Sequence, residues 1–127
     1  MQVQSMAGTF TEVSLEDMVT FLKRAFRALR PVPGPVTRGE ITYDLFLSPN
    51  TVIRIFTSVH RGQTMGADIG SDAIRIGLYS VVKDRPLKTG KLPIVKRTQG
   101  WRDNLKDRIE DEIEGFEERK GYWESRS

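Results

Sequence analysis

The stretch DAIRIGLYSVVKDRP, residues 72–86, decides the fold. Apolar side chains alternate in it with residues of other kinds: Ile74, Ile76 and Leu78 against Arg75, Gly77 and Tyr79. Alternation with a period of two is typical of a strand that buries one face. The pattern predicts a strand over about 72–82, and it leaves open why the other face carries an arginine, a glycine and a tyrosine.

Similar alternation predicts two earlier strands, at about 40–47 and 51–60. The three residues between them, 48–50, are turn formers of hairpin length. We expect a short fourth strand at 92–97, and loops in the remaining segments. These loops are a linker rich in proline and glycine at 31–40, a flexible segment rich in glycine at 61–72 and a basic loop at 83–91.

Two segments have the spacing of amphipathic helices. Ser14 precedes two acidic residues, which is a helix start signal, and an apolar stripe then runs to Leu29 before Pro31 ends the helix. A second helix is expected to begin near Trp101. Its apolar residues recur at steps of four and three: Trp101, Leu105, Ile109, Ile113 and Phe116.

This order predicts an α+β fold with an N-terminal helix, an antiparallel sheet of three to four strands and a C-terminal helix. Both helices are placed on one sheet face, so the other face is left open. The chain is expected to be a single domain, 1–127, with an ordered core of about 14–118 and short flexible termini. Tyr122 and Trp123 in the C-terminal tail either pack back or meet a partner.

Composition excludes several classes of site. The 127 residues contain no cysteine and one histidine, which excludes disulfides, thiolate zinc sites, cysteine nucleophiles and the usual histidine metal cluster. No apolar run approaches ~18 residues, and the N-terminus lacks the pattern of a signal peptide. We therefore expect a soluble cytoplasmic protein with no cofactor and no metal.

Charge is strongly segregated along the chain. Residues 1–22 carry three acids and no base, residues 23–108 carry seventeen bases and seven acids, and residues 109–127 carry three bases and seven acids. A basic middle between acidic ends favours a polyanionic partner, because binding to phosphates releases condensed counterions. The alternative is a basic segment whose charges only solvate the surface.

The open face is the candidate site. Alternation assigns arginines and aromatic rings to it, and single-stranded nucleic acid uses such groups for phosphate contact and base stacking. Gly77 would let a sugar or base approach the backbone, and Thr98 could cap the second helix beside further bases. The candidate binding residues are Arg54, Phe56, Arg75, Tyr79, Lys83, Arg85, Lys88, Lys91, Lys96, Arg97 and Arg102.

Catalytic interpretations have weaker patterns. Carboxylates could hold magnesium for a nuclease, yet their spacing matches no motif: Glu40, Asp44, Asp68, Asp72 and Asp84. His60 has no recognisable acid or nucleophile partner. We therefore expect no catalytic residue, although an enzyme is not excluded.

The element order resembles two known arrangements. Four antiparallel strands followed by a helix are similar to the single-stranded-DNA-binding modules of the Whirly type, which form oligomers and present sheet faces to the strand. Helix, three strands and helix are similar to the double-stranded-RNA-binding domain, although that family has a lysine-rich start to its last helix and this chain has WRDNLKDR there. Both likenesses concern element order over about 14–118, and no functional residue is carried across.

The sequence thus predicts a non-catalytic protein that binds single-stranded nucleic acid, DNA ahead of RNA, and that forms a homo-oligomer. The alternative is an assembly module whose open sheet face is the interface between copies.

Overall fold

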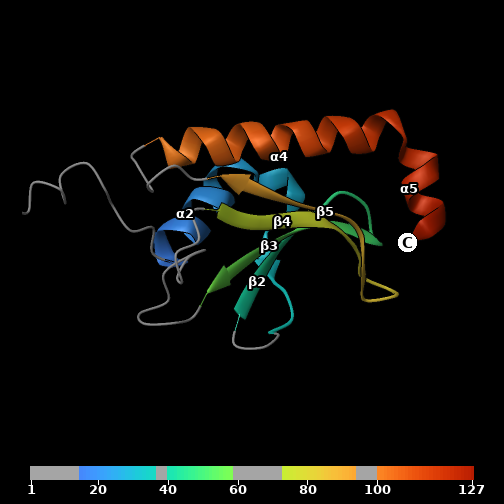
Figure 1. Cartoon of the computed structure of the whole chain (residues 1–127), viewed down its shortest axis with the longest axis horizontal. Helices are drawn as coiled ribbons and strands as arrows, with labels where there is room; N and C mark the ends of the chain where they lie inside the picture. The colour runs from blue at the N-terminus through green and yellow to red at the C-terminus, as the bar shows by residue number, and fades with distance from the viewer. Residues whose placement is uncertain (1–14, 37–39, 59–72, 94–99) are drawn as a thin grey trace, which may run out of the picture.

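The computed structural model describes residues 15–36, 40–58, 73–93 and 100–127, and its fold is an α+β arrangement of two helices on one antiparallel sheet (Figure 1). Helix α2 (Leu15–Ala25) and the short 3-10 helix η1 (Arg27–Leu29) precede the sheet. The sheet contains β1 (Val32–Pro33), β2 (Glu40–Phe46), β3 (Thr51–Ser58), β4 (Ala73–Ser80) and β5 (Arg85–Pro93), paired in that order. Helices α4 (Trp101–Glu118) and α5 (Lys120–Arg126) follow.

The predicted placement of both helices on one face of the sheet is confirmed. One core cluster joins two residues of α2, Phe26 directly after that helix, two residues of α4 and six of the central strands: Met18, Leu22, Phe26, Leu105, Ile109, Tyr43, Leu45, Ile53, Ile55, Ile76 and Leu78. Ile76 and Leu78 are among the residues that alternation in 72–86 assigned to the apolar face. In Figure 1, α4 runs along the length of the sheet. The opposite face is therefore covered by neither α2 nor α4.

Within the described residues the sheet has five strands, so the expected number of three to four was too low. The additional strand, β1, is two residues long and lies inside the segment expected to be only a linker. Val32 pairs with Asp44, and Pro33 pairs with Tyr43. A proline is tolerated at this place because an edge strand does not need every backbone N–H for pairing.

The prediction of a basic loop at 83–91 is wrong. A turn at 81–84 is followed by β5, which pairs with β4 along nearly its whole length. The sequence of β5 lacks alternation because this edge strand is exposed along most of Arg85–Thr89, and within that stretch the half-buried Leu87 alone packs against the core. The expected strand at 92–97 overlaps β5 at 92–93 and otherwise lies outside the described residues.

The first helix ends earlier than the proline signal predicted. Helix α2 stops at Ala25, and Arg30 adopts a left-handed conformation with φ of 48° directly before Pro31. A residue before proline is disfavoured in the right-handed helical region, which explains why η1 does not continue through Arg30.

The C-terminal tail forms helix α5, beyond the expected ordered core of 14–118. Trp123 packs against the main core, and the Ser127 hydroxyl lies 2.6 Å from the Thr51 hydroxyl. The tail therefore packs back onto the sheet at the start of β3. Among the described helices, none has the length and apolar character needed to cross a bilayer.

Candidate nucleic-acid interface

The open face of the sheet is formed by three cross-strand rows of side chains from β2, β3 and β4. The rows are Thr42, Phe56 and Arg75; Asp44, Arg54 and Gly77; and Phe46, Val52 and Tyr79. Because neighbouring side chains in such a row lie about 4.5–5.5 Å apart, the register alone determines which groups can meet.

Two arginines and two aromatic rings form a continuous chain of contacts on this face. The Arg75 guanidinium lies 4.3 Å from the centroid of the Phe56 ring, and the Phe56 and Tyr79 rings are 5.5 Å apart. The Arg54 guanidinium lies 4.8 Å from the Tyr79 ring. We call Arg75, Phe56, Tyr79 and Arg54 the cation–ring row. Both rings are half-buried and Arg75 is exposed, so the row presents aromatic surface and positive charge together.

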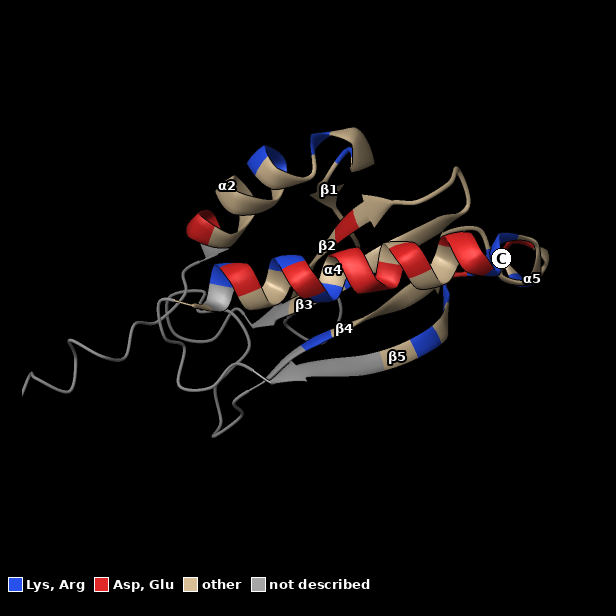
Figure 2. Ribbon diagram, turned by 90° about the horizontal axis from the view of Figure 1, so that it is seen from above, with Lys and Arg blue, Asp and Glu red and all other residues tan. Residues whose placement is uncertain are grey.

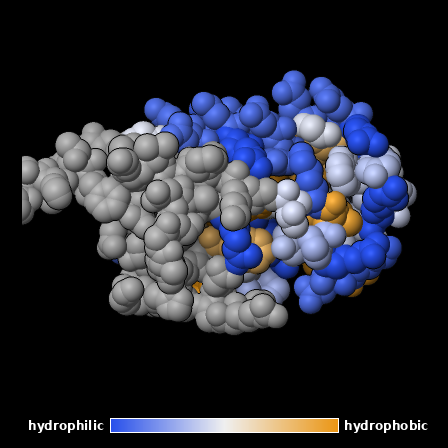
Figure 3. Space-filling model, viewed as in Figure 1, coloured by the Kyte–Doolittle hydropathy of each residue, from blue (hydrophilic) through white to orange (hydrophobic). Residues whose placement is uncertain are grey.

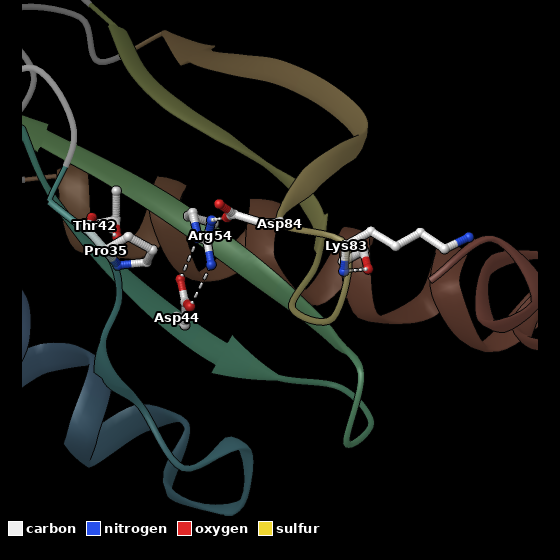
Figure 4. Close-up of polar contacts among 7 residues, drawn as sticks. Pro35, Thr42, Asp44, Arg54, Lys83 and Asp84 are labelled. Atoms are coloured by element: carbon white, nitrogen blue, oxygen red, sulfur yellow. Dashed lines mark hydrogen bonds and ion pairs between the residues drawn. The ribbon is translucent and has the colours of Figure 1, made fainter.

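Arg54 is placed differently from the expectation of an exposed phosphate contact. Its Nε and Nη2 donate hydrogen bonds of 2.8 and 2.9 Å to the two carboxylate oxygens of Asp44 (Figure 4). Both residues are only 5% exposed. Burial opposes the charge of the guanidinium, yet the hydrogen bond and the charge of Asp44 outweigh it and raise the pKa of Arg54. Arg54 thus binds a protein carboxylate and forms the buried end of the cation–ring row.

The segment after β1 closes this end of the open face. A side chain at Gly34 would collide with the Thr42 hydroxyl and the Asp44 carboxylate, so the backbone at Gly34 lies directly against them. The Thr42 hydroxyl donates a 2.8 Å hydrogen bond to the carbonyl oxygen of Pro35 (Figure 4). The proline-rich segment therefore explains why Thr42 and Asp44 are buried although they face away from the helices.

Gly77 does not leave room for a ligand, contrary to the expectation. A Cβ atom there would collide with the backbone carbonyl oxygen of Lys88 and would lie 3.2 Å from the Thr89 Cα and 3.4 Å from the Tyr79 ring. The backbone of β5 and the Tyr79 ring therefore occupy the space over this glycine. The missing side chain lets the ring lie close to Arg54, which is the direct cross-strand neighbour of Gly77.

We expect Gly77→Ala to lower the free energy of unfolding by about 1–3 kcal/mol, because the obstacle is backbone that cannot rotate away. Urea denaturation followed by circular dichroism measures the change. Gly115→Ala is the matched control, because nothing lies within 4 Å of its Cβ position on α4. That control should gain about 0.5–1 kcal/mol, as alanine does over glycine inside a helix. A Gly77→Ala protein as stable as the parent would contradict the close packing of β5.

The remaining candidate residues divide between the two faces. Lys83 and Arg85 are exposed at the turn that joins β4 to β5. Lys88 lies opposite Leu78 and forms a 3.2 Å ion pair with Glu112 of α4, so it belongs to the helix-covered side. Arg102 is exposed on α4, which packs on that same side.

Three further candidates have no described side chain. The backbone of Lys91 lies opposite Arg75 in the β4–β5 ladder, while Lys96 and Arg97 lie outside the described residues. The structure thus brings Arg54, Phe56, Arg75 and Tyr79 together, with Lys83 and Arg85 on the adjoining turn.

Acidic side chains gather on the other side of the molecule. Helix α4 carries eight acids and three bases, and all its acids except Glu112 are exposed. Figure 2 shows them in red along the outer flank of α4, and the surface over this helix is strongly hydrophilic in Figure 3. The acidic flank of α4 therefore lies on the side of the sheet opposite the cation–ring row.

A second group of arginines and rings on α5 was missed by the sequence reasoning. The guanidinium groups of Arg119 and Arg126 each lie 4.0 Å from the centroid of the Tyr122 ring, and the Trp123 ring is 4.9 Å from that ring. A hydrogen bond from Arg126 is the main cause that lowers the pKa of Tyr122. Spacings of three and four residues between Arg119, Tyr122 and Arg126 are the helical signal that could have revealed this group.

Asp44 and Asp84 were considered only as metal ligands from the sequence. Within the described residues no group of three or more histidine, cysteine, aspartate or glutamate side chains is placed to hold a metal ion. Asp44 instead binds Arg54, a pairing that the hairpin length could have predicted, because a three-residue connection at 48–50 places 44 opposite 54. Asp68, Asp72 and His60 lie outside the described residues.

Comparison with known proteins gives no indication of function, so any proposal must rest on the side chains described above. No protein-family model, curated protein or solved structure matches the chain. The likeness in element order to the Whirly and double-stranded-RNA-binding arrangements therefore stays a likeness of topology.

Proposed function

We propose that the chain is a non-catalytic module that binds single-stranded nucleic acid, DNA ahead of RNA, on the open face of its sheet. The observation that supports this most is the cation–ring row on a face that neither α2 nor α4 covers. Phe56 and Tyr79 offer ring surface for bases, and such stacking contributes about 1–3 kcal/mol per base. The cysteine-free composition supports a cytoplasmic location.

The basic residues have different parts in this proposal. Arg75, Lys83 and Arg85 are exposed and contact phosphates along the face and the β4–β5 turn. The Arg54 guanidinium packs against the Tyr79 ring and holds that ring in place. The acidic flank of α4 repels the backbone of the ligand, which directs it to the open face. Lys88 and Arg102 lie on the helix-covered side of the sheet, so they are not part of the proposed interface.

The test is a titration of labelled oligonucleotides of about twelve nucleotides, read by fluorescence anisotropy, between about 50 and 200 mM salt. Each phosphate contact contributes about 0.7 to the slope of log affinity against log salt for single strands. We expect Arg75→Gln to weaken binding and to reduce this slope by about 0.7. Arg24→Gln, an exposed arginine on α2, is the matched control and should bind like the parent. Absence of binding at the lowest salt overturns the proposal.

Homo-oligomer assembly is the second candidate function, and the separation of charge favours it. The acidic flank of α4 in one copy can meet the basic open face of another, a head-to-tail contact that forms rings or filaments. Light scattering on the parent and on Arg75→Glu separates the two functions. A mass that falls to that of one chain on charge reversal supports assembly, whereas an unchanged mass with lost oligonucleotide binding supports the ligand site.

A further inference from the structure

The buried Arg54 guanidinium has one edge without a hydrogen-bond acceptor. Asp44 takes up the edge formed by Nε and Nη2. Nη1 has only a 3.7 Å contact with Asp84 Oδ1, which is longer than a hydrogen bond. The Arg54 side chain is 6% exposed, and no hydrogen bond joins Nη1 to any residue that the structure describes. The donors of Nη1 at this edge can therefore accommodate an additional anionic oxygen.

The contacts around the Arg54 guanidinium fix the direction in which this edge points. The carboxylate of Asp44 fixes the plane of the guanidinium, and the Tyr79 ring lies against the group at 4.8 Å. Figure 4 shows the guanidinium between Asp44 on one side and Asp84 on the other. The donors of Nη1, and the remaining hydrogen of Nη2, thus point toward the 81–84 turn. A guanidinium fixed in this way loses little entropy when it binds a second anion.

The carboxylate of Asp84 lies beside the Nη1 edge of Arg54, but the ion pair between the two residues is weak. Its side chain is 78% exposed, and an exposed ion pair contributes about 1 kcal/mol at most. Its backbone has φ of 52°, in the left-handed region, which aspartate and asparagine tolerate better than most residues. The carboxylate can therefore move away from Arg54 without uncovering the core, and both neighbours in the chain, Lys83 and Arg85, are basic.

We propose that the outward edge of Arg54 is a subsite for one phosphate group of a nucleic-acid backbone, and that Asp84 occupies it in the absence of that ligand. This inference rests on the proposed function and adds its regulation. A phosphate offers two oxygens to the fork of an arginine, so it replaces a single long carboxylate contact with charge-assisted hydrogen bonds. Asp84 then lowers the affinity for every ligand, and ligands that engage the subsite must displace it.

The test is Asp84→Asn, which removes the charge and keeps a residue suited to the left-handed backbone. Asp111→Asn on the outer flank of α4 is the matched control, because it removes the same charge from an exposed position. We expect Asp84→Asn to bind the oligonucleotides about two- to fivefold more tightly and to steepen the salt slope by about 0.7. The control removes one of the eight acids of α4 far from the subsite, so it should raise the affinity much less than Asp84→Asn does and leave the salt slope unchanged.

A second measurement follows Arg54 itself. The Nε–H resonance of Arg54 should stand apart in NMR spectra because it donates to Asp44. We expect inorganic phosphate to shift the guanidinium resonances saturably in Asp84→Asn and less in the parent. In Asp84→Asn/Arg54→Lys, which keeps the charge but loses the fork, the gain in oligonucleotide affinity should disappear, with circular dichroism to verify folding.

The outcomes separate the two proposals. If the parent binds oligonucleotides and Asp84→Asn binds them no better, the subsite is wrong and the proposed function stands. If no protein binds oligonucleotides but phosphate shifts Arg54 in Asp84→Asn, the subsite stands for a different phosphate ligand and the proposed function is wrong. If neither response occurs, both are wrong.

Discussion

Asp44→Ala should lower the free energy of unfolding by about 3–5 kcal/mol, because it leaves the Arg54 guanidinium buried without its carboxylate. The two hydrogen bonds of 2.8 and 2.9 Å and the 5% exposure of both residues place this pair among buried ion pairs. Charged surface pairs contribute far less. The measurement is urea denaturation at neutral pH, followed by circular dichroism.

The double variant Asp44→Leu/Arg54→Met is the control for this prediction. Replacing both partners with apolar side chains removes the unpaired charge, so the double variant should regain most of the lost stability. Lys106→Ala, which breaks the exposed ion pair with Glu110 on α4, should cost less than about 1 kcal/mol. A cost for Asp44→Ala as small as that of Lys106→Ala would contradict a buried Arg54.

The combined change Phe56→Leu/Tyr79→Leu should weaken oligonucleotide binding by about 2–6 kcal/mol. Two rings are removed, and each stacked base contributes about 1–3 kcal/mol. Leucine keeps apolar cover over the strands, so the change removes stacking more than packing. Anisotropy titration at the lowest salt measures the loss.

The matched control is Phe21→Leu, another half-buried ring, which packs on the helix-covered side. It should leave oligonucleotide affinity unchanged, and thermal unfolding of both proteins shows that the parent fold persists. If the two-ring variant retains full affinity while the salt slope stays steep, the ligand contacts phosphates alone and the rings only pack the sheet.

Strands with one covered face could be predicted from the sequence, and strands without such a face could not. Alternation located β2, β3 and β4 to within two residues, because a helix layer requires apolar side chains at every second position. The edge strand β5 has no such requirement, and β1 is too short to show a period. Helix α4 began at Trp101 as predicted, since its stripe follows from packing on the same core.

The membership of the open face was largely predictable, but the burial of its members was not. Alternation assigned Arg54, Phe56, Arg75 and Tyr79 to that face. Three tertiary contacts then decided their roles: the backbone at Gly34 against Asp44, the backbone of β5 over Gly77, and Asp84 beside Arg54. These contacts join segments whose relative placement has no local signature, so the sequence showed which side chains share a face but not which of them reach solvent.

The exposed acids of α4 and the exposed Arg75 lie on opposite sides of the sheet. For the proposed polyanionic ligand, this arrangement favours an approach with the open face forward. We expect a bound strand to leave the molecule at the rim of the sheet, because the acids of α4 repel its phosphates.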